Sequence, residues 1–180
     1  MSKKISRRGL LIGGGAATAL AVGGAFGLEH INVPWVPSNG FTGHIQNIIR
    51  ADSAVVDSTV TGKYGESFLN HTKKMEITGK ITFTKDLDKD RLHRTYQQLT
   101  MRVAKNMVSS AELQGGFINV AAESGGTQID TLDTLKYLVE MNRAPEDQLK
   151  KIREEIQRAE SDNKRVDLKF YSTLTPDKGY

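Results

Sequence analysis

MEITGKITFT, at residues 75–84, is the stretch that decides the fold of this chain. Its apolar side chains lie two residues apart, with one glycine among them: Met75, Ile77, Ile81 and Phe83. This period is that of a strand with one buried and one solvated face, which is typical of antiparallel sheets. Gly79 occupies an inward position of the pattern, which predicts a bulge or the close approach of another backbone segment.

The segments on either side of this strand have the three-to-four-residue apolar spacing of amphipathic helices. Residues 41–56 predict a helix with Thr42 as its N-cap, and residues 64–72 predict a further helical turn. The acidic residues 86–90 suit the positive end of a helix dipole and begin a helix that runs to residue 110. The buried stripe of that helix is predicted to be Leu92, Tyr96, Leu99, Val103 and Met107.

The C-terminal half adds helices and a second strand. Residues 115–122 are an apolar run that predicts a short buried strand or a packed loop. Residues 129–142 and 145–159 predict a helical hairpin, in which Pro145 is the first residue of the second helix. Residues 166–174 alternate like residues 75–84 and predict a strand of the same sheet. The sequence therefore predicts an α+β fold, in which a small, mainly antiparallel sheet packs against three or four helices.

The charge of the chain is concentrated at its N-terminus. The chain has 25 basic and 21 acidic residues, and residues 1–28 hold four basic residues and no acidic one. The remainder therefore has no formal net charge, which argues against a nucleic-acid partner because such a partner requires a basic excess. The chain has no cysteine, which excludes disulfides, thiolate metal sites and a cysteine nucleophile.

Residues 1–28 have the pattern of an export signal, a basic segment followed by an uncharged, glycine-rich apolar run over residues 9–28. The start of this run resembles the twin-arginine (Tat) signal family, whose pattern is Ser/Thr-Arg-Arg-x-Phe-Leu-Lys. Leu10 stands where phenylalanine is commonest in that family, and Ile12 replaces the frequent lysine. The residues that carry the resemblance are Ser6, Arg7, Arg8, Leu10 and Leu11.

The resemblance implies export of the folded chain by the Tat translocase, to the periplasm or to the extracellular face of the cytoplasmic membrane. Ala19-Leu20-Ala21 is an A-x-A cleavage signal. If the leader is retained instead, residues 9–28 extend about 30 Å as a helix, enough to anchor the chain in a membrane. The predicted organisation is a signal peptide or anchor at residues 1–28, a linker at 29–40 and a single globular domain at 41–180.

Residue patterns that carry chemistry are sparse behind the leader. The four histidines, at positions 30, 44, 71 and 93, lie outside i, i+4 spacing of one another. Asp90 and His93 share one helical face, and we interpret them as two exposed residues and not as metal ligands. Gly125-Gly126 precedes a helix but lacks the lysine of a phosphate-binding loop. The sequence therefore predicts no metal, no cofactor and no identifiable catalytic residue.

Three functions from different classes fit these observations. The favoured one is an extracytoplasmic, non-catalytic accessory or binding protein, the small subunit of a larger exported complex with a protein partner. The second is an enzyme or a metal-binding protein whose site the sequence does not reveal. The third is a membrane-anchored structural component of an envelope or particle.

Overall fold

The computed structural model describes residues 36–66 and 71–177. The chain divides into two units, residues 1–32 and 33–180, and all described residues belong to the second unit. The predicted export-signal residues Ser6, Arg7, Arg8, Leu10 and Leu11 lie outside the described residues, as do residues 29–35 of the predicted linker. In the part of the chain that is described, no helix is both long enough and apolar enough to span a bilayer.

The described residues form an α+β fold, as the sequence predicts, with a seven-stranded mixed sheet and five helices. In chain order the elements are β1 (Val36–Pro37), α1 (Asn39–Arg50), β2 (Val55–Ser58), β3 (Thr61–Glu66), β4 (Lys73–Phe83), α2 (Lys89–Ser110), β5 (Gly115–Ser124), β6 (Thr127–Asp130), α3 (Thr131–Glu140), α4 (Glu146–Ser161), β7 (Val166–Asp167) and α5 (Leu168–Ser172).

The sheet is built around β4 and β5, which pair in parallel. The main strand order is β1-β3-β4-β5-β6, while β2 also pairs with β4 and β7 also pairs with β5. All pairings other than β4–β5 are antiparallel, which agrees with the predicted mainly antiparallel sheet. A parallel pair requires a crossover connection, and α2 provides it.

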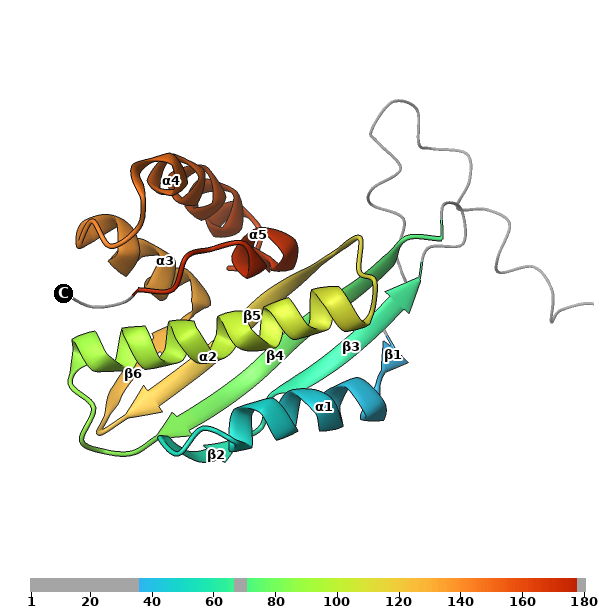
Figure 1. The fold of residues 1–180 in the computed structure, drawn as a ribbon, viewed down its shortest axis with the longest axis horizontal. Coiled ribbons are helices and arrows are strands. Elements are labelled where there is room, and N and C mark those ends of the chain that lie inside the picture. Colours follow the sequence, from blue (N-terminus) through green and yellow to red (C-terminus); the bar gives the residue numbers. More distant parts are fainter. Residues whose placement is uncertain (1–35, 67–70, 178–180) are drawn as a thin grey trace, which may run out of the picture. The chain divides into compact units, whose positions relative to one another are not determined.

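The core lies between the sheet and the helices on one of its faces. Figure 1 shows α1 and α2 on the same side of β3, β4 and β5. The predicted alternation of β4 is confirmed, because its apolar side chains are buried on this side. The predicted stripe of α2 is also confirmed, since all five of its members are buried: Leu92, Tyr96, Leu99, Val103 and Met107.

Gly79 confirms the predicted close approach of backbone segments. Its φ is +136°, and a Cβ atom at this position would lie 2.6 Å from the carbonyl oxygen of Thr59. Glycine is the residue that tolerates both this conformation and this contact. The glycine therefore lets the segment between β2 and β3 pack directly against β4.

The prediction of a helix over residues 41–56 is wrong at both ends. α1 begins at Asn39, and its N-cap is Ser38, not Thr42. The hydroxyl of Thr42 instead accepts a hydrogen bond from the backbone N–H of Gly62 at 3.0 Å and so ties α1 to β3. The helix ends at Arg50, after which the Asp52 carboxylate accepts from the N–H of Ala54 in a side-chain turn.

The segment after α1 forms strands where the sequence predicts helix. β2 begins at Val55, a β-branched residue that favours strands, and pairs with the end of β4. The helical turn predicted over residues 64–72 is wrong for its first part, because residues 64–66 belong to β3. Both strands hydrogen-bond to β4, and this long-range pairing outweighs the local helical spacing.

The strand predicted over residues 166–174 is mostly wrong. Only β7 is a strand, and it pairs with β5 and not with β4. The Asp167 carboxylate accepts a hydrogen bond from the N–H of Phe170 at 2.7 Å, so this residue caps a helix where the pattern predicts a strand. The helix α5 then buries Tyr171, whose hydroxyl lies 2.8 Å from that of Thr100 on α2.

The remaining predictions of helices and strands are confirmed in outline. The apolar run at residues 115–122 is a strand, β5, and it continues into a hairpin with β6 that the sequence pattern does not predict. The turn of this hairpin is Gly125-Gly126, with φ of +54° and +88°, as type I′ turns require. The helical hairpin is α3 and α4, although Pro145 is the N-cap of α4 and not its first residue.

Candidate functional site

The structure gives different surroundings to Asp90 and His93, which lie three residues apart on α2. His93 is buried, with 3% of its surface exposed, so the prediction of two exposed residues is wrong for the histidine. The Asp90 carboxylate lies 3.5 Å from the guanidinium of Arg143. In the described part of the chain, no group of three His, Asp or Glu side chains could hold a metal ion.

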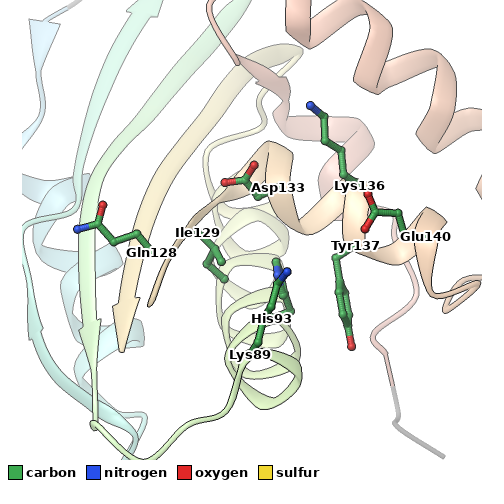
Figure 2. Close-up of a pocket in the computed structure, with 8 residues that line it drawn as sticks. All are labelled: Lys89, His93, Gln128, Ile129, Asp133, Lys136, Tyr137 and Glu140. Atoms are coloured by element: carbon green, nitrogen blue, oxygen red, sulfur yellow. The ribbon is translucent and has the colours of Figure 1, made fainter. Parts of the chain in front are cut away.

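His93 lies in the wall of a cavity of about 300 Å³, which we call the histidine pocket. Figure 2 shows this pocket between the start of α2, the strand β6 and one face of α3. Its outer rim is charged, and its inner wall is formed by two rings. The lining residues are Lys89, His93, Gln128, Ile129, Asp133, Lys136, Tyr137 and Glu140.

The imidazole of His93 is fixed by two contacts with α3. It stacks on the ring of Tyr137, with 4.3 Å between ring centroids and 4° between ring planes. Its Nδ1 lies 3.2 Å from the hydroxyl oxygen of Thr134. That hydroxyl donates its proton to the carbonyl oxygen of Asp130, so Nδ1 of His93 carries the proton and donates to Thr134.

This tautomer leaves a lone pair on Nε2 of His93, for which no donor is present among the described residues. Burial lowers the pKa of His93 to about 4, and the positive charge of Lys89 adds to this effect. The negative charge of Asp90 opposes it only in part. The imidazole is therefore neutral at neutral pH, with its Nε2 available as an acceptor.

Asp133 forms the acidic side of the histidine pocket. Asp130 and Asp133 make a capping box at the start of α3, in which each carboxylate accepts from the backbone N–H of the other residue, at 2.8 and 3.0 Å. Burial raises the pKa of Asp133, and the nearby charge of Asp130 raises it further. Lys164 contacts Asp130 at 2.8 Å and compensates part of this negative charge.

Arg143 holds the outer side of Tyr137. Its guanidinium carbon lies 5.9 Å from the centroid of the tyrosine ring, and it forms ion pairs with Asp90 at 3.5 Å and Asp177 at 3.4 Å. Asp177 is buried, so one of these pairs is shielded from solvent. The pairs connect α2, the segment after α3 and the C-terminal segment, and thereby fix the two rings of the pocket.

A second surface lies on the side of the sheet opposite α1 and α2, and we call it the open face. No described helix covers its centre (Figure 1). Its side chains are polar or half-buried and come from alternate positions of β3, β4 and β5, which the strand register places side by side. They are Thr61, Lys63, Glu76, Thr78, Lys80, Thr82, Phe117, Asn119, Ala121 and Glu123.

The centre of the open face is a row of neutral polar residues across three strands. Thr61 pairs with Thr78 in the register of β3 and β4, and Thr78 pairs with Asn119 in that of β4 and β5. The side chains of these three residues make no hydrogen bond within the described part of the chain. Their donors and acceptors are therefore available to a molecule that approaches the sheet.

One end of the open face is an arginine–aromatic cluster. Two guanidinium groups, those of Arg158 and Arg165, lie 5.8 and 5.5 Å from the ring centroid of Phe117. Arg165 also donates to the Glu76 carboxylate at 2.9 Å, and Arg158 to that of the buried Glu155 at 2.6 Å. At the other end of the face, Lys80 pairs with Glu123.

Neither the histidine pocket nor the open face is predicted from the sequence. One signal for the histidine pocket was present, because His93, Gln97 and Thr100 follow the helical period beside the apolar stripe of α2. The pocket can accept a hydrogen bond at Nε2 and bind charged groups at its rim, and the open face offers a polar docking surface. Comparison of the chain with protein-family models, curated proteins and solved structures finds no significant match.

Proposed function

We propose that this chain is an exported, non-catalytic binding protein, the accessory subunit of a larger exported complex, and that its protein partner docks on the open face. The observation that carries this proposal is the row formed by Thr61, Thr78 and Asn119. These side chains offer hydrogen bonds without a net charge, and they lie side by side on the three central strands β3, β4 and β5. Such a surface suits another polar protein surface.

The two ends of the open face support the same partner class. Aromatic and arginine side chains are enriched among the residues that dominate binding energies at protein interfaces, and Phe117 with its two arginines is such a group. The charged residues of the face are already paired with one another. Binding therefore does not require a strongly charged partner, which agrees with the balanced charge of the chain behind the leader.

Export is the second part of the proposal, and it rests on the Tat-like residues of the leader, above all Arg7 and Arg8. The Tat route implies that the domain folds before it crosses the membrane, so the open face is complete when the chain reaches the outer side. If the leader is retained, it keeps the chain at the membrane. The partner is then reached at that surface.

The proposal is tested by a photo-crosslinking amino acid placed at Asn119 in the full chain, expressed in its native cells. The matched control places the same amino acid at Lys105, an exposed residue of α2 on the other side of the sheet. We expect Asn119 to give one discrete adduct with a second protein in the exported fraction and Lys105 to give none. Equal labelling from both positions, or an adduct of Asn119 only with its own chain, would refute docking on the open face.

A further inference from the structure

The segment that follows α5 is bound by side-chain amides of two helices. Figure 1 shows this segment, in dark red, between α2 and the pair of α3 and α4, and residues 174–177 form neither helix nor strand. Gln97 of α2 donates to the carbonyl oxygen of Thr175 at 3.3 Å and accepts from the backbone N–H of Asp177 at 3.0 Å. Gln148 of α4 accepts from the N–H of Thr175 at 3.0 Å and donates to its hydroxyl oxygen at 2.9 Å.

Two further polar side chains bind the end of the segment. Gln98 donates to the carbonyl oxygen of Asp177 at 3.1 Å, and Arg143 pairs with the Asp177 carboxylate at 3.4 Å. Leu174, at the other end, is buried. Hydrogen bonds to the main chain, together with pockets for individual side chains, are the features by which proteins recognise extended peptides. We call this site the glutamine groove, and its polar residues are Gln97, Gln98, Arg143 and Gln148.

The walls of the glutamine groove are held by contacts that do not involve residues of the segment. The stacked rings of His93 and Tyr137 join α2 to α3, and Arg143 is also paired with Asp90 of α2. Gln97 is buried, with 1% of its surface exposed, and a buried amide without a hydrogen-bond partner is unfavourable. If the segment leaves, the walls therefore remain in place, and Gln97 requires another occupant with which to pair.

We propose that the glutamine groove is an exchangeable peptide-binding site, in which an extended segment of a partner protein replaces residues 174–177. The segment that fits has an apolar residue, then serine or threonine, then any residue, and then aspartate. Its third position accepts proline, since Pro176 has no N–H to donate. The tethered segment competes with the partner at an effective concentration on the order of millimolar, and it thereby limits binding to sequences that match.

This site is separate from the open face, because the groove is built from α2, α4 and the turn between α3 and α4. It does not depend on the docking proposal.

The first test measures the binding of a fluorescent peptide of residues 172–180, with blocked ends, to the full chain by fluorescence anisotropy. In the variant Asp177→Asn, the internal segment loses its ion pair with Arg143. The matched control is Asp86→Asn, at an exposed position outside the groove. We expect the dissociation constant of the peptide to be about tenfold lower for Asp177→Asn than for the control or the unsubstituted chain. Equal constants for the three chains, or no saturable binding to Asp177→Asn, would overturn the proposal.

The second test requires no substitution in the chain. The same peptide carries a photo-crosslinking amino acid in place of Pro176, which is exposed in the structure, and is added at millimolar concentration to the unsubstituted full chain. We expect adducts on α2 or α4 that an excess of the unlabelled peptide suppresses and that a peptide with asparagine in place of Asp177 does not. Adducts on other elements only, no adduct, or equal suppression by both peptides would each refute exchange at this groove.

Discussion

The imidazole of His93 is neutral because burial and the nearby Lys89 both disfavour its charged form. The unfolded chain exposes the same group to water, where its pKa returns to the ordinary value near 6.5. As pH falls from about 6.5 towards 4, the unfolded state therefore binds a proton that the folded state does not. The stability of the fold decreases over this range and is unaffected by His93 at higher pH.

We predict that lowering the pH from 7 to 5 reduces the free energy of unfolding by up to about 2 kcal/mol through His93 alone. The substitution His93→Gln removes this dependence, whereas His44→Gln, at an exposed position of α1, retains it. The measurement is urea unfolding of the three proteins at several pH values. If the free energy of unfolding of His93→Gln falls with decreasing pH as steeply as that of the unsubstituted protein, the imidazole of His93 is not buried in its neutral form.

The parallel pair of β4 and β5 is the element on which both candidate sites depend. It presents the open face on one side and supports α2, which carries His93, on the other. Gly116 allows this pairing, because its φ is +141° and a Cβ atom there would lie 2.1 Å from the carbonyl oxygen of Met75. Gly115, the preceding residue, has no such constraint, since its Cβ would find its nearest neighbour at 3.9 Å.

We predict that Gly116→Ala lowers the free energy of unfolding by about 3 kcal/mol, because it combines an unfavourable backbone conformation with a clash against β4. Gly115→Ala should change stability by less than about 1 kcal/mol. Thermal and chemical unfolding of the two variants provide the comparison. If the Gly116→Ala and Gly115→Ala variants are similarly stable, β5 can move away from β4 without loss of folding stability.

At the scale of the whole molecule, the sequence predicts a leader over residues 1–28, which contains Arg7 and Arg8, and a separate domain over residues 41–180. Because the two arginines lie in the predicted leader, we expect changes at Arg7 and Arg8 to affect transport and to leave the folded domain as it is.

We predict that replacing Arg7 and Arg8 together by lysine keeps the domain folded and retains it inside the cell, since the Tat resemblance depends on the arginine pair. Cell fractionation gives the location, and thermal unfolding of the purified variant gives the fold. The control is the pair Lys3→Arg and Lys4→Arg, which preserves charge and leaves the arginine pair intact. Normal export of the double-lysine variant would indicate the general secretory route.

The sequence predicts the parts of the fold that are governed by local periodicity. The alternation in β4 and the stripe of α2 are unambiguous because each continues over several turns or residue pairs. The predictions failed where the segments are short. The helix predicted over residues 41–56 and the strand predicted over residues 166–174 each extend into a short segment whose structure is set by a distant partner: β4 for residues 55–58 and α2 for residues 168–172.

The sequence by itself determined the α+β class, the buried stripe of α2, the inward position of Gly79 and the balanced charge of residues 29–180. The tertiary structure alone decided that β4 and β5 are parallel, that one sheet face is uncovered by described helices, and that His93 is buried against Tyr137. The physical reason is the range of the interactions. Periodicity and charge are properties of neighbouring residues, whereas strand order and the tautomer and pKa of His93 depend on groups about forty residues away.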